Sequence, residues 1–573
     1  MACFLLYFNQ YVNAPILYDG LVYEDVYKNL REKLETDYYE KLIDEYILNN
    51  PHAVLVDMNP KPGLAIENEK ALEKKLAEYK ASLSEEQIAE LIAQTKALKA
   101  YQEEPSPKEI LEKIPLLERE DIGKNVRPVH NEEKELCGIK TVHHNVHTNG
   151  IIYLDMMFDV DSLSEYVPQM SFLATLLGYM DTTEHTYREF DTETNFYSGG
   201  IGSDLNIYSI YDTDAVKLKF TVRTKTLAGR IKDTTKLMAE MMFKTLFTDE
   251  KHLREVVAET RSRLKVRLMS AGHQAAVSYS MAGLTLDGWY NDYSMGIGYY
   301  DYLVKLDENF DSEKEKLIKG CEELVKAMFK KEKMLISCTC DENDYGLLGG
   351  ARSEFDSELE NFEKENSADI FGLESYKPDV KYRKTAFSTP AEVQYAAVSG
   401  SYKDVPDVND GAMMVVKHLL SYGYLWNEVR VKGGAYGVMC RFSRAGSGSF
   451  VSYRDPNLSA TYDVYKKAAD FLENYDADER EVTKTIIGTI SGLDTPLTPS
   501  MDGKRSMSMY LTKTPLEVIQ KERNQVLACT KEDIRNTADA VRKIANTENI
   551  CVIGNEKRIK DEASLFESIK PLS

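Results

Sequence analysis

The sequence predicts an α+β protein with two tandem, homologous modules, each an antiparallel-rich sheet packed by helices. A partial module and a helical hairpin linker are predicted to precede them. The first observation behind this fold class is the length of 573 residues, which is too great for one hydrophobic core. The second is an internal repeat, in which the same order of strands and helices occurs twice. Hydrophobic residues make up 43% of the chain, as in an ordinary globular protein.

Residues 1–62 are predicted to be the C-terminal remnant of a preceding α+β module. A helix-like stretch, Tyr38–Ile47, leads into the apolar segment His52–Pro60, which has the pattern of a closing strand. Nothing before this segment supplies the other parts of a module. We therefore expect the chain to begin inside a module, whose apolar surface a partner or an upstream segment would cover.

Residues 63–118 are predicted to form a charged helical hairpin. Apolar residues recur at helical spacing from Leu72 to Leu83. A capping box at Ser84–Gln87 predicts where the second helix begins, and the proline-containing segment Glu103–Pro107 predicts its end. The apolar stripe is too short for the sustained heptads of a coiled-coil arm.

The first full module is predicted at residues 119–345, and a polar linker at residues 346–384. Its parts are an opening strand, a glycine-rich strand region, an acidic helix start and a closing strand. In that order they are predicted at Gly150–Phe158, Ser198–Gly202, Asp249–His252 and Met334–Ser337. A long helical pattern follows the opening strand.

The second full module is predicted at residues 385–573. The same four parts are predicted at Val393–Gly400, Gly433–Gly437, Asp478–Glu481 and Ile550–Ile553. The order of the parts agrees between the two copies, while their residue identities barely agree. This is the pattern expected of two diverged modules.

The net charge of −22 argues against nucleic acid as a partner, because binding to phosphates needs clustered Lys and Arg. It is compatible with attracting basic peptides, although solubility alone explains the charge equally well. No apolar run is long enough to span a bilayer, so we expect no membrane partner. The first residues lack the basic start of a signal peptide. We expect a cytoplasmic protein, unless a targeting segment lies upstream.

The eight cysteines are scattered, which favours reduced thiols. Cys338 and Cys340 would face the same side of a strand, as buried small side chains rather than as a metal pair. The cluster His143, His144 and His147 could bind zinc as three imidazoles in five residues. We expect it to form an exposed loop instead, because no carboxylate or cysteine near it in the sequence completes a ligand set. We expect no metal ligand in this chain.

The segment Arg430–Gly437 carries the most specific chemistry. Arg430 and Tyr436 could offer two hydrogen-bond donors to one carbonyl oxygen. Gly433 and Gly434, with Ala435 beside them, would let another backbone come close. The alternative is a strand edge with a surface Arg and a packed Tyr. Other glycine clusters lack the spacing of nucleotide-binding loops, and no serine or cysteine nucleophile signature is evident.

The stretch Leu425–Gly437, continued by Ser452–Asn457, resembles the C-terminal half of the presequence-protease and falcilysin branch of the pitrilysin/insulinase zinc metallopeptidases. The resemblance implies four α+β domains that form two bowl-shaped halves around a peptide chamber. It implies that Arg430 and Tyr436 are catalytic residues, which bind the scissile carbonyl and the developing oxyanion, and that Gly433, Gly434 and Ala435 lie along the bound peptide.

The zinc signature of that family, His-x-x-Glu-His on a helix, does not occur in the sequence; the segments that begin at His185 and His418 are incomplete. We therefore expect zinc to belong to an N-terminal half, in the same polypeptide or in a separate chain, and we expect this chain alone to be inactive toward unstructured peptides. The alternative is a zinc-less peptide-binding or scaffold subunit that acts with a separate zinc-bearing partner. A self-associating scaffold, which predicts a stable homodimer, is a third possibility.

Overall fold

The computed structural model describes residues 23–572, apart from residues 105, 367–369 and 371. The chain divides into two compact units, Met1–Ile114 and Pro115–Ser573, and each is described by itself. No helix in the described part of the chain has both the length and the apolar character needed to cross a membrane.

The first unit is helical. Its helices are α2 (Glu24–Lys33), α3 (Tyr38–Ile43), the π-helical turn η2 (Asp44–Leu48), α4 (Leu64–Ser82), α5 (Glu85–Glu103) and α6 (Lys108–Leu111). The predicted capping box is confirmed, since the Gln87 N–H donates to Ser84 Oγ (3.2 Å) and the Ser84 N–H donates to Gln87 Oε1 (2.9 Å). The predicted hairpin helices therefore form, one on each side of Leu83.

The predicted closing strand at His52–Pro60 is wrong. Residues 53–60 have no regular secondary structure, and the side chain of Leu55 is 96% exposed. An extended apolar segment becomes a strand only when a neighbouring strand satisfies its backbone groups, and no described strand pairs with this one. The proposed remnant module also includes residues 1–22, which lie outside the described residues.

The second unit holds two six-stranded sheets. The first has the order β1-β2-β6-β3-β5-β4, and only β2 and β6 are parallel neighbours. Its strands are β1 (Glu132–Leu136), β2 (Ile139–Asn145), β3 (Ile151–Asp159), β4 (Ile201–Ser209), β5 (Val216–Leu227) and β6 (Met334–Cys340). The predicted opening and closing strands of the first module are confirmed as β3 and β6, which pair with each other.

The second sheet has the order β12-β7-β11-β8-β10-β9. Its strands are β7 (Lys384–Thr389), β8 (Gln394–Ser401), β9 (Gly437–Phe442), β10 (Ser447–Tyr453), β11 (Ile550–Asn555) and β12 (Ser568–Pro571). The closing strand β11 again pairs with the opening strand β8 and lies parallel to the strand on its other side, β7. In both sheets the strand that follows the glycine pair, β4 or β9, is an edge strand. The two modules therefore share one topology, as the repeat predicts.

Helices cover the first sheet. They are α7 (Val167–Leu176), α8 (Tyr187–Tyr197), α9 (Ile231–Phe243), α10 (Glu250–Ser270), α11 (Gly272–Ala282), α12 (Leu286–Met295), α13 (Ile297–Glu308) and α14 (Phe310–Met328), followed by the short α15 (Glu342–Tyr345) and α16 (Leu348–Ala351) and by α17 (Ser353–Glu365). The predicted acidic start is confirmed, because the Asp249 side chain caps α10. Phe355 and Leu359 of α17 are buried in the first core, so the predicted linker begins with helices that pack on this module.

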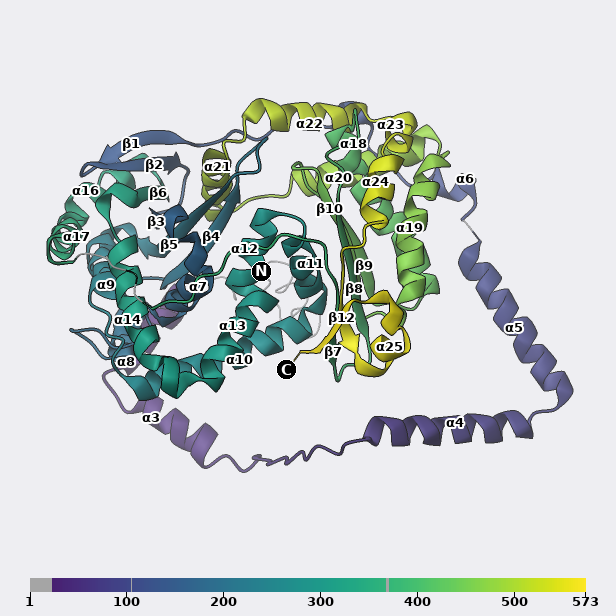
Figure 1. Cartoon of the computed structure of the whole chain (residues 1–573), viewed down its shortest axis with the longest axis horizontal. Coiled ribbons are helices and arrows are strands. Elements are labelled where there is room, and N and C mark those ends of the chain that lie inside the picture. Colours follow the sequence, from purple (N-terminus) through teal and green to yellow (C-terminus); the bar gives the residue numbers. More distant parts are fainter. Residues whose placement is uncertain (1–22, 105, 367–369, 371, 573) are drawn as a thin grey trace. The chain divides into compact units, whose positions relative to one another are not determined.

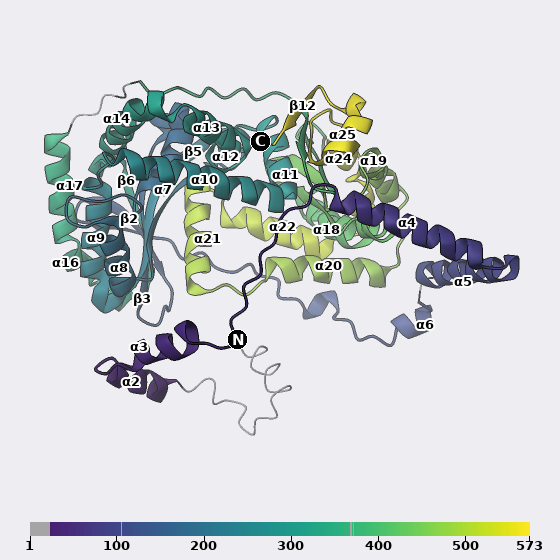
Figure 2. The same cartoon turned by 90° about the horizontal axis from the view of Figure 1, so that it is seen from below.

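The second module has its own helices. They are α18 (Asp410–Leu419), the π-helical turns η7 (Leu420–Tyr424) and η8 (Trp426–Lys432), α19 (Ser459–Glu473), α20 (Glu479–Leu493), α21 (Pro499–Thr512), α22 (Leu516–Ala528), α23 (Lys531–Arg535), α24 (Ala538–Ala545) and α25 (Glu556–Asp561). The Asp478 side chain caps α20, as its acidic start predicts. Helices α20 and α22 run side by side (Figure 2).

The two modules exchange helices. Helix α11 of the first module packs on β8 and β11 of the second sheet, and α21 of the second module packs on β6 and β2 of the first (Figure 1). Each contact is close enough to require glycine: a Cβ at Gly272 would collide with the ring of Tyr395, and a Cβ at Gly503 would collide with the side chain of Thr339. The two helices hold equivalent positions in the repeat, directly after α10 and α20. The exchange joins the modules.

Candidate functional site

Arg430 lies on the π-helical turn η8, just before the edge strand β9. Its guanidinium stacks over the Trp426 ring, 4.2 Å from the ring centroid, and lies 5.2 Å from the centroid of the Tyr436 ring. Nη1 donates a hydrogen bond to the Tyr436 carbonyl. A guanidinium has five donors in a planar fork, and this arrangement fixes the fork between two aromatic rings.

Tyr436 precedes β9 directly, and 63% of the residue is exposed. Its backbone N–H donates to the Tyr453 carbonyl (3.1 Å), and its ring meets the Tyr453 ring edge-on at 5.7 Å. The backbone is therefore fixed while the phenol faces solvent. The interpretation of Tyr436 as a packed side chain does not fit this exposure. The structure brings Arg430 and Tyr436 together, as the sequence predicts.

The turn Gly433–Ala435 is shaped by its own contacts. Gly434 has a φ of +81°, in the left-handed region that favours glycine. A Cβ at Gly433 would collide with the Val429 carbonyl oxygen, and the Ala435 N–H donates to that same oxygen (3.1 Å). Ala435 is buried in the second core. These contacts explain the glycines without a docked peptide, so contact of Gly433, Gly434 and Ala435 with substrate stays a prediction.

The second half of the motif, Ser452–Asn457, supports this turn. The Asn457 side chain donates to the Gly433 carbonyl (2.7 Å). Asp455 is fully buried and accepts bonds from the Asn457 N–H (2.9 Å) and from Thr461 Oγ1 (2.7 Å). Burial raises the pKa of the Asp455 carboxyl. This segment therefore holds the backbone beside Tyr436 in place.

A cavity of about 1050 Å³ lies in the first module, away from Arg430 and Tyr436. Residues of α7, α8, β4, α10 and α12 line it, among them Tyr187, Arg188 and Arg267. The sequence analysis did not foresee this cavity, because its walls come from segments that are far apart in the chain.

The prediction of an exposed histidine loop is wrong for two of the three histidines. His143 and His144 are fully buried on β2, whereas His147 is exposed. His144 lies between the His130 carbonyl (2.5 Å from Nδ1) and Ser337 Oγ (3.0 Å from Nε2). Burial lowers the pKa of His144 to about 4. The strand is interior because β1 and β6 flank it, a pairing that the polar letters of the sequence concealed.

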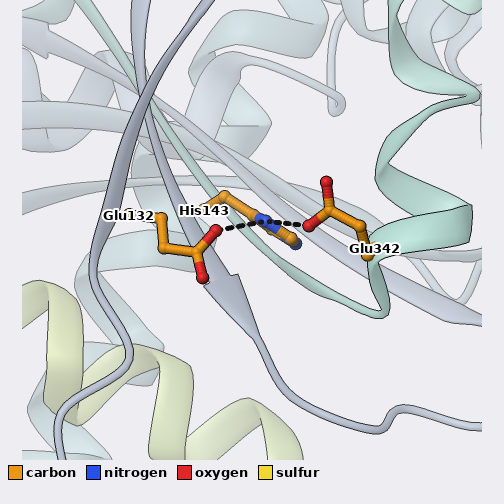
Figure 3. Close-up of side chains that lie close together, drawn as sticks. All are labelled: Glu132, His143 and Glu342. Carbon is orange, nitrogen blue, oxygen red and sulfur yellow. Dashed lines mark ion pairs between the residues drawn. The ribbon is translucent and has the colours of Figure 1, made fainter.

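Carboxylates do gather around His143, which corrects a second expectation. Its Nδ1 lies 3.8 Å from Glu132 and 3.4 Å from Glu342 (Figure 3). However, Lys134 Nζ lies 3.0 Å from the same nitrogen and 2.8 Å from both oxygens of Glu342. The ammonium group therefore takes the place that a cation would need. This cluster is an ion-pair network with a lysine inside it.

Cys338 and Cys340 are fully buried on the same face of β6, as predicted, with their sulfur atoms 3.5 Å apart. Cys340 Sγ lies 3.8 Å from His143 Nε2. Hydrogen bonding to Cys338 lowers the pKa of the Cys340 thiol. No described residue supplies a second cysteine pair around these thiols.

Comparison with known proteins places most of the chain. Residues 58–306 match the family model for the region associated with peptidases of family M16, subfamily C, and residues 384–556 match "PreP C-terminal domain". The chain is 33% identical to Protein HypA of Clostridium perfringens, over 97% of this chain and 57% of that protein. It is 30% identical to Presequence protease 1, chloroplastic/mitochondrial, of Arabidopsis thaliana, over 97% of this chain and 52% of that protein.

The chain thus spans about half the length of the curated relatives it matches. Among solved structures, the crystal structure of a protease from Helicobacter pylori matches with a TM-score of 0.50 and 15% identity. That match covers 74% of this chain and 99% of the other. At this identity the likeness supports the fold alone, as two helix-packed sheets.

Proposed function

This chain belongs to the presequence-protease family of peptidases, to whose C-terminal region it corresponds, and from that premise we propose its function. It is the non-zinc-binding half of a metalloendopeptidase that degrades unstructured peptides. It closes the peptide chamber and contributes Arg430 and Tyr436 to the substrate.

The observation that carries this proposal is the paired exposure of a cation and a phenol on a rigid turn. The Arg430 guanidinium lies 5.2 Å from the ring of Tyr436, which is 63% exposed. Hydrogen-bond donors that are fixed before the reaction stabilise negative charge as it develops on a carbonyl oxygen. Arg430 keeps its charge at any physiological pH, and the Tyr436 phenol remains a neutral donor.

The residues of this chain do not fit the zinc site of the family. The sequence contains no His-x-x-Glu-His segment, and the cluster around His143 is filled by Lys134. We therefore assign the zinc to an N-terminal half, either in the same polypeptide or in a separate chain. The role of this chain is to bind and orient the peptide carbonyl.

The net charge of −22 supports basic peptides as the preferred substrates, because an acidic chamber raises their local concentration. This preference predicts that peptide capture weakens as salt is added. A zinc-less binding or scaffold subunit would share the charge but would not need an exposed Arg430 and Tyr436 side by side.

The test is to mix this chain with a separately produced, zinc-bearing N-terminal half of a presequence protease and to measure cleavage of a quenched basic peptide. We expect cleavage in the mixture and none with either half alone. If the halves form a complex that does not cleave the peptide, the binding or scaffold role replaces this proposal. Steady cleavage by this chain alone would contradict the assignment of zinc to the other half.

A further inference from the structure

A second group of metal-ligand side chains lies in the first module, between α8 and α9. Ligand atoms of Glu184, His185 and Glu240 all lie within 4.8 Å of one another. His185 Nδ1 is 2.9 Å from Glu240 Oε1. Glu240 belongs to α9, whereas Glu184 and His185 belong to the turn that leads into α8. The cluster is thus made by tertiary folding.

The turn that carries two of these residues is held in shape before any ligand binds. Thr182 Oγ1 accepts the N–H groups of Glu184 (3.1 Å) and His185 (2.9 Å), and the Thr182 N–H donates to the His185 carbonyl (2.9 Å). The Thr182 hydroxyl also donates to Glu240 Oε1 (2.5 Å). Such supporting bonds fix the orientation of ligand side chains.

Glu240 gives independent evidence of a missing ligand. The residue is only 2% exposed, and its Oε1 takes the bonds from Thr182 and His185. Its other oxygen, Oε2, has no hydrogen-bond partner among the described residues. A buried carboxylate oxygen without a partner is unfavourable, and a coordinated cation would satisfy it.

The comparison with the cluster in Figure 3 shows why this one is open. There, Lys134 Nζ contacts His143 and both oxygens of Glu342. Here, Lys244 Nζ donates to Glu184 (2.8 Å) and Glu358 (2.9 Å), and no hydrogen bond joins it to Glu240 in the described part of the chain. The imidazole and the buried carboxylate therefore face no ammonium group.

We propose that Glu184, His185 and Glu240 bind a divalent transition-metal ion such as Mn²⁺ or Zn²⁺. One imidazole nitrogen with two carboxylates suits these ions, whereas Mg²⁺ and Ca²⁺ prefer all-oxygen sites. The side chains of His185 and Glu184 are 33% and 34% exposed, which leaves an entry path from solvent. Tyr187 and Arg188, which follow His185, line the 1050 Å³ cavity, so the ion would fix one wall of that cavity.

The test is a Mn²⁺ titration of the chelator-treated chain, followed by the electron paramagnetic resonance signal of free Mn²⁺. We expect one tightly bound ion per chain and a weakening of affinity by at least about tenfold in Glu240→Gln, as for loss of a ligand. Zn²⁺ should displace the Mn²⁺. The matched control is Glu342→Gln, which alters the lysine-filled cluster and should leave binding unchanged.

Because Glu240 is buried, its variant could fail to fold, so the half-exposed His185→Asn provides a second test. Mn²⁺ should raise the Tm of the unaltered chain and not that of folded His185→Asn. Equal Mn²⁺ binding by the unaltered chain and His185→Asn, or no binding by the unaltered chain, would overturn the proposal. The experiment needs no N-terminal half, so its outcome is independent of the proposed peptidase role.

Discussion

At the residue scale, the phenol of Tyr436 is the group whose exposure most needs a function. Its ring contacts Tyr453 on one side, and the backbone on both sides of it is fixed by hydrogen bonds. A fixed, exposed donor costs no reorganisation when charge develops near it. The same phenol on a mobile loop would lose that advantage.

Tyr436→Phe should therefore lower kcat of the reconstituted enzyme by on the order of tenfold to a thousandfold, as for loss of one oxyanion donor. KM should change little if the donor acts mainly in the transition state. The matched control is Tyr422→Phe, a phenol that is 70% exposed on η7 and should leave kcat unchanged. Unchanged kinetics in Tyr436→Phe would remove this hydroxyl from the mechanism.

His144 predicts how stability depends on pH. Burial lowers its pKa from 6.5 to about 4, so the unfolded chain binds more protons than the folded chain between these values. Stability is therefore fully present above pH 6.5 and is lost as pH falls toward 4, by on the order of 3 kcal/mol for this residue.

His144→Gln should flatten that dependence, measured as the urea midpoint at pH 7.5 and pH 5. The control is His147→Gln, because the His147 side chain is 80% exposed and should leave the dependence as it is. An unchanged pH dependence in folded His144→Gln would show that other groups govern it.

At the scale of elements, local signals predict what neighbours do not decide. The capping residues Ser84, Asp249 and Asp478 mark three helix starts correctly, because a cap acts within one turn of helix. The strand expected at His52–Pro60 fails because a strand needs a partner. Strand β2 was missed because the burial of His143 and His144 depends on residues far along the chain, such as Ser337 and Cys340.

The candidate sites divide in the same way. Arg430 and Tyr436 could be predicted because they lie six residues apart in a motif that resembles a known family. Glu184 and His185 are adjacent in the sequence, but Glu240 lies 55 residues beyond His185. Only the packing of α9 against the turn before α8 brings the three together, so no spacing pattern could reveal them.

Helix α21 gives a prediction about close packing between elements. Gly503→Ala should destabilise the chain by about 2 kcal/mol or more, because the new Cβ would collide with Thr339 on the first sheet. The control is Gly492→Ala, an exposed glycine in α20 with no atom within 4 Å of a new Cβ. That change should stabilise the chain by roughly 0.5 kcal/mol through helix propensity. Urea denaturation of both variants measures the difference. A neutral Gly503→Ala would mean that α21 can move away from the sheet.

At the scale of the whole molecule, the exchange of α11 and α21 makes the two modules depend on each other. Met507 and Leu511 of α21 pack with Val142 and Met157 of the first sheet in a buried cluster of their own. Helix α11 in turn covers β8 and β11 of the second sheet. Removing either module would leave an apolar sheet face open to water, and each module would also lose the core that its own exchanged helix shares.

The second unit, Pro115–Ser573, should therefore unfold in a single cooperative transition, although it holds two sheets. A fragment of residues 115–365, which has the first sheet without α21, should bind the dye ANS and lack a sharp thermal transition, because Val142 and Met157 would be exposed. The fragment 115–573 is the control and should keep the sharp transition of the full chain in calorimetry. A monodisperse 115–365 fragment with its own sharp transition and no dye binding would show that each module folds independently and that the exchanged helices only dock afterwards.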